Sequence, residues 1–400
     1  MTTVAQVITP GPRTKDGAPT VLQVVPNLVT GGVERGAVDM AAALTRTGGT
    51  AIIASEGGPL EYELKRIGAI HVRLPMASKN PIVMARNIAR LKKLILSENV
   101  DIVHARSRAP AWSAYYAAKA TGRHFITTFH APYNFSNGLK RRYNAIMTRG
   151  ERVIAISEFI AGHIEQYYKV EPTRVRVVQR GVDLRHFDPD QVSAERVIKL
   201  ATDWRLPDGV PLVLLPGRLT RWKGQSILLD ALTELRDLDF CCVLVGSDQG
   251  RTSYRQELER QIMANGLAGK AFIFDNCSDM AAAYMLSDVV VSASTDPEGF
   301  GRVVSEGQAM GRPVVASDHG GAREQLIPGT TGFLFENGDP SSLASALRKA
   351  LSLNSEERFK LSKLAITRVR TLFSKERMCN GTLGLYNELI RSDAHRTMDR

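Results

Sequence analysis

Two glutamates, Glu298 and Glu306, are the first candidates for chemistry in this sequence. They lie at positions 298 and 306 of the segment PEGFGRVVSE, on either side of a Gly-Phe-Gly turn. An apolar run precedes this segment and a helical pattern follows it, so the turn is predicted to join a strand to a helix. Two carboxylates in one segment could act as an acid/base pair, as in a glycosidase, or could grip a bound ligand.

The spacing argues against two carboxylates that act across one bond. If the helix begins near Gly301, Glu306 lies about one to one and a half turns inside it, whereas Glu298 precedes it. Even on a continuous helix, eight residues would leave two side chains about 80° apart. Gly299 and Gly301 permit a sharp turn that exposes backbone N–H groups at the helix start, where phosphate oxygens are stabilised. The segment therefore predicts a phosphate-bearing ligand with a glutamate on either side.

Two other groups of residues follow apolar strands. Arg218 and Lys223 come after LVLLP, and two cations five residues apart can straddle a diphosphate. Gly31 and Gly32 follow the first strand, where glycines let backbone N–H groups approach an anion. Their spacing is not that of a dinucleotide-binding loop, so that interpretation is weak. A solvated basic loop and a tight turn remain the alternatives for these two groups.

Strands that alternate with helices must position these residues. Short, nearly continuous apolar runs are typical of parallel strands buried on both faces, and helical patterns separate them. In the first half such runs are Thr20–Leu28, Thr50–Ser55, Ala69–Pro75, Asp101–Arg106, His124–His130 and Arg152–Ser157.

A second set of such runs begins after about residue 185. It includes VPLVLLPGR, FCCVLVGS, KAFIFD, DVVVSAST and RPVVASD. Two doubly wound α/β domains follow from this alternation. We expect a disordered lead at 1–19, an N-terminal domain at 20–185 and a C-terminal domain at 186–375. A helix at 376–400 is expected to return to the N-terminal domain.

Composition indicates a globular protein of 400 residues, 44% hydrophobic and 23% charged. No apolar run reaches the length of a spanning helix, and the first residues lack the order of a signal peptide. The four cysteines have no metal-ligand spacing, so no metal site is predicted. A reducing cytoplasm is the simplest location.

Charge is distributed unevenly along the chain. Residues 1–185 contain 26 Lys and Arg against 13 Asp and Glu, a net charge of +13, so the remainder carries −2 of the total of +11. Such asymmetry suggests a nucleic acid, an acidic membrane surface or an acidic substrate as partner of the first half. No zinc spacing, basic heptad region or RNP-like strand supports nucleic-acid binding, so none is predicted.

The segment Pro297–Phe335 resembles the retaining glycosyltransferases of the GT-B fold, specifically glycosyltransferase family 4. These enzymes carry an E-x7-E signature, which Glu298 and Glu306 match. The resemblance extends through GRLTRWKG, GGVE, TFH, VIAISEFI and RGVD and covers nearly the whole chain after about Thr20. It implies two Rossmann-like domains that face each other across a cleft.

The resemblance also implies roles for single residues. Arg218 and Lys223 would hold the diphosphate of a nucleotide-sugar donor, Glu306 the ribose and Glu298 the transferred sugar. Backbone amides at the helix start would help to bind the phosphates, and so would the two glycines of the first domain. These are the amides of Phe300, Gly301 and Arg302 and the backbone of Gly31 and Gly32. His130 would lie near the anomeric centre, so it and Glu298 are the predicted catalytic residues.

A retaining transfer of this kind is expected to need no metal and no cofactor. Cations and the helix dipole would stabilise the leaving diphosphate, which would take the proton of the acceptor on the same face of the sugar. In the family, UDP is the commonest donor nucleotide and GDP the next, so a UDP-sugar is favoured.

The acceptor is expected in the basic first domain. Arg106 and Arg108 follow a strand, where guanidinium groups could bind a carboxylate or phosphate. Lys140, Arg141 and Arg142 lie beside apolar residues at helical spacing, which suits an anionic membrane surface, although an ordinary surface helix is as good an interpretation. We therefore predict an acidic glycolipid, lipopolysaccharide or polysaccharide acceptor and a peripheral location on the inner face of the cytoplasmic membrane. The alternative is a catalytically silent GT-B scaffold that binds a nucleotide sugar or a membrane.

Overall fold

The computed structural model describes residues 18–29 and 31–398, with side chains up to residue 391. The predicted disordered lead at 1–19 lies outside the described residues except for its last two positions. The chain forms two compact units. The first comprises residues 1–156, 160–178 and 378–400, and the second comprises residues 157–159 and 179–377.

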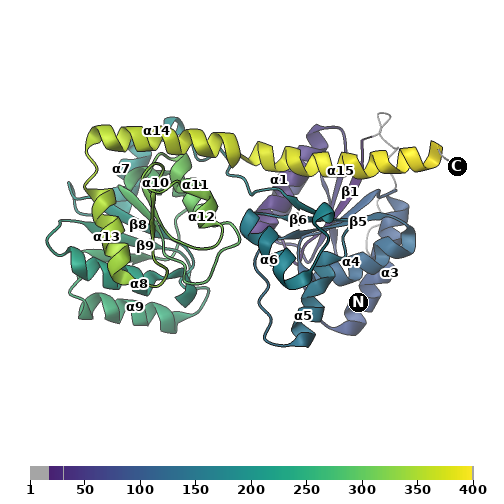
Figure 1. The fold of residues 1–400 in the computed structure, drawn as a ribbon, viewed down its shortest axis with the longest axis horizontal. Helices are drawn as coiled ribbons and strands as arrows, with labels where there is room; N and C mark the ends of the chain where they lie inside the picture. Colours follow the sequence, from purple (N-terminus) through teal and green to yellow (C-terminus); the bar gives the residue numbers. More distant parts are fainter. Residues whose placement is uncertain (1–17, 30, 399–400) are drawn as a thin grey trace. The chain divides into compact units, whose positions relative to one another are not determined.

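The first unit contains a seven-stranded parallel sheet with the order β3-β2-β1-β4-β5-β6-β7 (Figure 1). Its strands are β1 (Thr20–Val24), β2 (Thr50–Ser55), β3 (Ile70–Arg73), β4 (Ile102–Ala105), β5 (His124–Phe129), β6 (Arg152–Ala155) and β7 (Val175–Val177). Its helices are α1 (Gly32–Arg46), α2 (Glu61–Arg66), α3 (Pro81–Ser97), α4 (Arg108–Thr121), α5 (Gly138–Asn144) and α6 (Glu158–Tyr168).

The C-terminal helix α15 (Lys375–Met398) completes the core of this unit. Cys379, Tyr386 and Leu389 are buried together with residues of β1, α1 and β2. In Figure 1 the yellow helix α15 lies along the unit close to α1 and β1. Helices α1, α2 and α15 therefore pack together over β1 and β2. Helices α3 and α4 pack against each other, and α4 also packs on β4 and β5.

The second unit contains a six-stranded parallel sheet with the order β10-β9-β8-β11-β12-β13. Its strands are β8 (Leu212–Pro216), β9 (Cys241–Val245), β10 (Ala271–Phe274), β11 (Val289–Ser292), β12 (Val314–Ser317) and β13 (Phe333–Phe335). Its helices are α7 (Ala194–Asp203), α8 (Gln225–Leu232), α9 (Thr252–Ala264), α10 (Met280–Leu286), α11 (Arg302–Ala309), α12 (Ala322–Gln325), α13 (Pro340–Leu351) and α14 (Ser355–Leu372).

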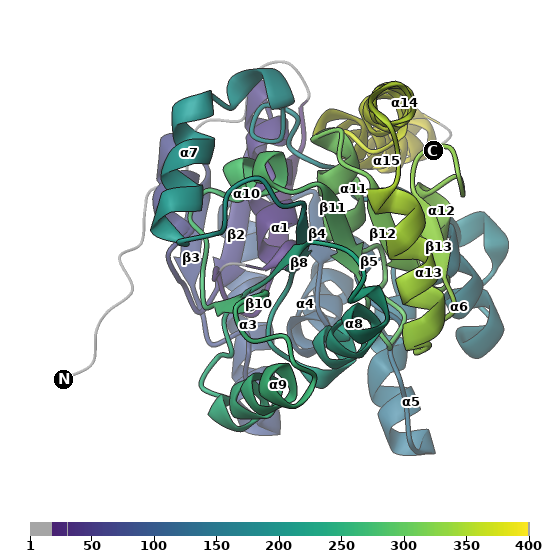
Figure 2. The same ribbon diagram turned by 90° about the vertical axis from the view of Figure 1, so that its left-hand side faces the viewer.

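Alternate residues of β8 point into two separate cores. Val213 and Leu215 pack with α8, α9 and α13, whereas Leu212 and Leu214 pack with α10 and α11 on the opposite face. Figure 2 shows these two groups of helices around the second sheet. A strand buried on both faces needs apolar residues at every position, and this is why the run LVLLP is recognisable as a central strand. The predicted α/β architecture with two doubly wound sheets is confirmed.

Candidate active site

The topological switch point of the second sheet lies between β8 and β11. The chain continues from β8 to β9 on one side, whereas β11 pairs with β8 on the other. Helices on opposite faces leave room for a ligand at the carboxyl ends of two such strands. The loop after β8 carries Arg218 and Lys223, and the loop after β11 carries Glu298.

Close backbone contacts join these two loops. Gly224 has a φ of 73°, and a Cβ at this position would lie 1.8 Å from the carbonyl oxygen of Ala293. The backbone N–H of Thr295 donates to the carbonyl of Trp222 at 2.7 Å. Lys223, between these two contacts, is therefore held against the end of β11.

Lys223 and Glu298 form an ion pair at this point. The Lys223 Nζ lies 2.7 Å from Oε1 of Glu298, and the hydroxyl of Ser294 donates to the same oxygen at 2.6 Å. Only 13% of the Lys223 side chain and 19% of the Glu298 side chain are exposed. Burial raises the pKa of the Glu298 carboxyl, but the charge and hydrogen bonds of Lys223 and Ser294 outweigh it, so the pKa is lowered overall. Glu298 is therefore a carboxylate that can accept hydrogen bonds from hydroxyl groups.

The Gly-Phe-Gly turn positions the start of α11. Gly301 is its N-cap with a φ of 85°, a conformation that favours glycine. No side chain caps α11 and no acidic residue lies in its first turn, so its first N–H groups remain open to an anion. Phe300 is 2% exposed and packs against Phe373, so it can offer a ligand its backbone but not its ring.

The segment after β12, which includes α12, supports this turn. The backbone N–H of Gly321 donates to the carbonyl of Glu298 at 2.9 Å. The buried carboxamide of Gln325 donates to the carbonyls of Phe300 and Gly301. A Cβ on Gly321 would lie 2.5 Å from Cα of Phe300, so only glycine permits the two loops to approach this closely.

Glu306 lies inside α11 and has a different environment from Glu298. The hydroxyl of Tyr284 donates to its Oε2 at 2.8 Å, and Nη1 of Arg302 lies 3.9 Å from its Oε1. Burial, followed by the charge and hydrogen bond of Glu306, raises the pKa of Tyr284 well above its usual range. Tyr284 therefore stays protonated and fixes Oε2 of Glu306, whereas Oε1 lies at 3.9 Å from Arg302 and can still accept a hydrogen bond from a ligand.

The second unit thus holds most of the predicted donor-binding residues at one end of its sheet. Arg218 is exposed, and within the described residues its side chain forms no hydrogen bond or ion pair. Sequence reasoning missed Ser294, Tyr284 and Gln325, which orient the predicted residues. A serine four positions before Glu298 was visible, but nothing in the sequence pairs Tyr284 with Glu306.

The remaining predicted donor and catalytic residues belong to the first unit. His130 directly follows β5, and Gly31 and Gly32 begin α1. The carboxylate of Glu34 lies beside Gly31, with Oε2 at 2.1 Å from the point where a Cβ would stand. Contacts of His130, Gly31 and Gly32 with a donor stay predictions.

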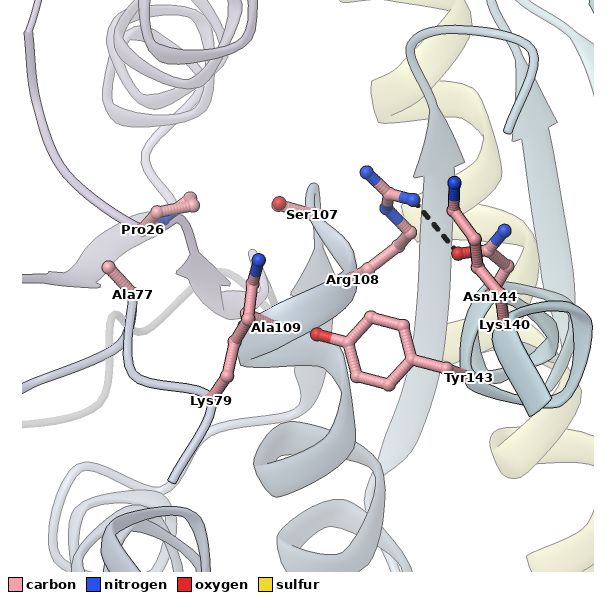
Figure 3. Close-up of a pocket in the computed structure, with 9 residues that line it drawn as sticks. All are labelled: Pro26, Ala77, Lys79, Ser107, Arg108, Ala109, Lys140, Tyr143 and Asn144. Atoms are coloured by element: carbon pink, nitrogen blue, oxygen red, sulfur yellow. Dashed lines mark hydrogen bonds between the residues drawn. The ribbon is translucent and has the colours of Figure 1, made fainter. Parts of the chain in front are cut away.

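The two arginines predicted for the acceptor have different surroundings. Arg106 is 5% exposed, its Nε donates to Oε1 of Gln23 at 2.6 Å, and burial lowers the pKa of its guanidinium. Arg108 instead lines a pocket of about 540 Å3 at the start of α4 (Figure 3). An acceptor contact stays a prediction for both residues, and the pocket makes Arg108 the one with access to a ligand.

The basic residues predicted to face a membrane lie on α5, and all three are exposed. Lys140 lines the same pocket, and Arg142 is not among the residues that line it. The guanidinium of Arg141 donates to the carbonyl of Tyr167 at 2.5 Å. Ile146 and Met147, the neighbouring apolar residues, are buried in the unit. Membrane contact by Lys140, Arg141 and Arg142 stays a prediction.

The described residues contain no candidate membrane-spanning helix and no candidate metal site. None of the helices there combines the length and the hydrophobicity that crossing a membrane requires. Within the same residues, no group of three or more His, Cys, Asp or Glu side chains is arranged to hold a metal ion.

Family comparisons cover most of the chain. The model of Glycosyltransferase Family 4 matches residues 30–186, and that of Glycosyl transferases group 1 matches residues 198–368. The crystal structure of a glycosyltransferase from Rickettsia africae is 40% identical, with a TM-score of 0.87, and covers 93% of this chain and 98% of its own. The Anabaena protein Alr3699/HepE, in complex with UDP-glucose, is 22% identical with a TM-score of 0.80, covering 92% and 99% of the two chains, and shows the fold alone.

A D-inositol 3-phosphate glycosyltransferase from Thermobifida fusca is 32% identical over 221 residues, or 53% of this chain. The match spans half, 50%, of that relative's length. The two family models match consecutive parts of the chain, and the Rickettsia africae structure shares its fold over nearly the whole length. Both findings agree with the two doubly wound units. The chain therefore belongs to glycosyltransferase family 4 and has the GT-B fold.

Proposed function

We propose that the protein is a retaining, metal-independent glycosyltransferase. It transfers a hexose from a nucleotide-diphosphate sugar to an acidic glycolipid, lipopolysaccharide or polysaccharide acceptor at the cytoplasmic face of the membrane. The observation that carries the proposal is the arrangement of Lys223, Glu298, the open start of α11 and Glu306 at one switch point.

Each of these groups suits one part of a nucleotide-sugar. The cations Arg218 and Lys223 and the first N–H groups of α11 stabilise the diphosphate. Glu306, with one oxygen held by Tyr284, accepts hydrogen bonds from the ribose, and Glu298 accepts them from hydroxyls of the sugar. Lys223 pairs with Glu298 in the structure, so the ammonium group of Lys223 would contact both that carboxylate and the donor phosphates.

The proposed transfer breaks the bond between the anomeric carbon and the diphosphate oxygen. The acceptor oxygen forms its bond to the same carbon on the same face, and its proton passes to the leaving phosphate. Lys223, Arg218 and the helix dipole stabilise the negative charge that develops there. The catalytic role of His130 remains a prediction from the family resemblance.

A donor screen tests the proposal. Thermal-shift measurements with UDP-, GDP- and ADP-sugars identify the nucleotide, and UDP-glucose is tested first because the Anabaena structure contains it. Product analysis on candidate glycolipids then follows, with the anomeric configuration determined by NMR. We expect a product with the configuration of the donor. An inverted product would refute the retaining mechanism, and donor binding without transfer or hydrolysis would favour a silent scaffold.

Chelation tests metal independence separately. Since cations of the chain and a helix terminus surround the proposed diphosphate site, transfer is expected to continue at an unchanged rate in excess EDTA. The measurement is the initial rate before and after chelation. Complete loss of activity that added Mg2+ or Mn2+ restores would contradict this part of the proposal.

A further inference from the structure

A pocket of about 540 Å3 lies at the switch point of the first sheet. The chain continues from β1 to β2 on one side, and β4 pairs with β1 on the other. Pro26 follows β1, Ser107 follows β4, and both line the pocket. Carboxyl ends of strands at a switch point are the usual ligand position in open parallel sheets, so the pocket has the location of a binding site.

The charged residues of the pocket are all cationic. Lys79, Arg108 and Lys140 line it, and its other lining residues include no Asp or Glu. In the described part of the chain none of these three cations forms an ion pair. Three uncompensated cations around one space favour an anionic ligand.

Arg108 is held in place by neutral groups. Its Nη1 donates to Oδ1 of Asn144 at 2.8 Å, and its guanidinium carbon lies 4.4 Å from the ring centroid of Tyr133. An amide and an aromatic ring fix its orientation without neutralising its charge. Its remaining N–H groups are therefore available to a ligand.

The start of α4 adds backbone donors. Ser107 is the N-cap but its side chain makes no capping hydrogen bond, and the first turn of this 14-residue helix contains no acidic residue. Arg108 and Ala109, the first two helical residues, line the pocket. Their N–H groups have no partner within the helix, and the helix dipole places a partial positive charge there.

Tyr143 supplies an independent observation. Its hydroxyl oxygen is buried and, among the described residues, has no hydrogen-bond partner. Burial raises the pKa of Tyr143 more than Arg108 lowers it, so the hydroxyl remains a donor. Figure 3 shows this hydroxyl pointing toward Lys79 and the start of α4, whereas the guanidinium of Arg108 turns toward Asn144. A buried donor without a partner at the wall of a cationic pocket points to a ligand oxygen.

We propose that this pocket binds a phosphate monoester group of the acceptor, an inference that rests on the proposed function of the first unit. Lys79, Arg108, Lys140 and the start of α4 together match a dianion better than the single charge of a carboxylate. Tyr143 donates to one of its oxygens. Lys140 then serves the acceptor pocket and not a membrane surface.

Binding of inorganic phosphate to the full-length protein tests this. Calorimetry is performed at constant ionic strength with saturating UDP, so that the proposed donor site is occupied. We expect saturable binding of one phosphate that weakens about tenfold or more in Arg108→Gln and Lys79→Gln, the loss expected for a charge-assisted hydrogen bond. Tyr143→Phe, which keeps the ring, is expected to weaken binding several-fold.

Matched controls separate this site from general charge effects. Lys92→Gln removes a charge from an exposed position of α3 outside the pocket and is expected to leave phosphate binding unchanged. Equal weakening by Lys92→Gln, equal binding of acetate, or no binding at all would overturn the proposal. Because UDP binding is titrated first, its failure would count against the proposed function and not against the pocket.

Two sources of the phosphate group are then compared. Glucose 6-phosphate represents a soluble sugar phosphate, and vesicles that contain phosphatidic acid represent a lipid one. Displacement of inorganic phosphate by either one in the wild type but not in Arg108→Gln supports the pocket and identifies the source. Failure of both to displace it would overturn the assignment to an acceptor.

Discussion

At the scale of single residues, the Lys223–Glu298 pair links stability to the site. Glu298 keeps a lowered pKa because Lys223 and Ser294 stabilise its charged form against the effect of burial. A carboxyl group with a lowered pKa contributes stability above its pKa in the unfolded chain, and that contribution is lost as the pH falls through the folded value. The pair therefore stabilises the second unit at neutral pH and less in acid.

Lys223→Met should reveal this dependence. Removing the ammonium group leaves a largely buried carboxylate without its cation, so the free energy of unfolding should fall by about 1 to 3 kcal/mol at pH 7. The loss should shrink below the ordinary glutamate pKa of about 4.3, since Glu298 is then protonated in the unfolded chain and the pair's contribution declines. Urea unfolding at pH 7 and pH 4 measures both values, and an equal loss at the two would contradict the assignment.

Arg218 should behave in the opposite way. Its side chain is exposed and, in the described structure, makes no hydrogen bond or ion pair. Arg218→Gln should therefore leave the melting temperature unchanged while weakening UDP binding about tenfold, the effect of one charge-assisted hydrogen bond. Titration calorimetry with UDP provides the measurement. A change in melting temperature without a change in affinity would show a structural role instead.

At the scale of elements, glycine is required in two turns for different reasons, although the two glycines have similar φ angles. A Cβ added at Gly301 (φ 85°) would have no heavy atom closer than 3.8 Å, whereas one added at Gly224 (φ 73°) would meet the Ala293 carbonyl oxygen at 1.8 Å. The first turn needs glycine for its backbone conformation only. The second needs it also for the close approach of two loops.

Alanine at each position should separate these effects. Gly301→Ala should lower the free energy of unfolding by about 1 to 2 kcal/mol, the cost of a left-handed conformation. Gly224→Ala should lower it by about 3 kcal/mol or more, because overlap adds to that cost. Thermal and urea unfolding of the two variants provide the comparison. Equal losses would mean that the loops after β8 and β11 separate without cost.

The central strands and the edge strands β3 and β10 could be predicted from the sequence, whereas the edge strands β7 and β13 could not. Thr50–Ser55 was predicted with its observed bounds because the strand β2 is buried at every position after Thr50. The edge strands β7 and β13 have three residues each and were missed, since so short a run has no period. Helix and loop contacts such as Tyr284 with Glu306 depend on tertiary packing, which spacing along the chain does not encode.

At the scale of the whole molecule, Tyr386 of α15 completes a hydrogen-bond network with β4 and β5 of the first sheet. The hydroxyl of Tyr386 lies 2.7 Å from Nδ1 of His104, and Nε2 of His104 lies 2.7 Å from the hydroxyl of Thr128. Burial, with the charge of Arg106, lowers the pKa of His104 well below its usual range, so the ring is neutral. Each of its nitrogens thus depends on one hydroxyl partner.

Tyr386→Phe should therefore destabilise the protein. Loss of the hydroxyl leaves one nitrogen of His104 buried without a partner, at a cost of about 1 to 3 kcal/mol. Tyr62→Phe is the control, because Tyr62 is 75% exposed and its change should stay within about 0.5 kcal/mol. Urea unfolding followed by circular dichroism measures both variants. A loss in Tyr62→Phe as large as in Tyr386→Phe would remove the case for the network.

The assignment of residues 378–391 to the first unit also sets an order of events during synthesis. Domains usually fold as they emerge, the N-terminal one first. Here the second unit, residues 157–159 and 179–377, has been made in full while the first still lacks Cys379, Tyr386 and Leu389 from its core. The unit that the ribosome begins first is therefore the one that it finishes last, and a nascent chain halted at residue 377 would expose an apolar face of the first sheet to chaperones.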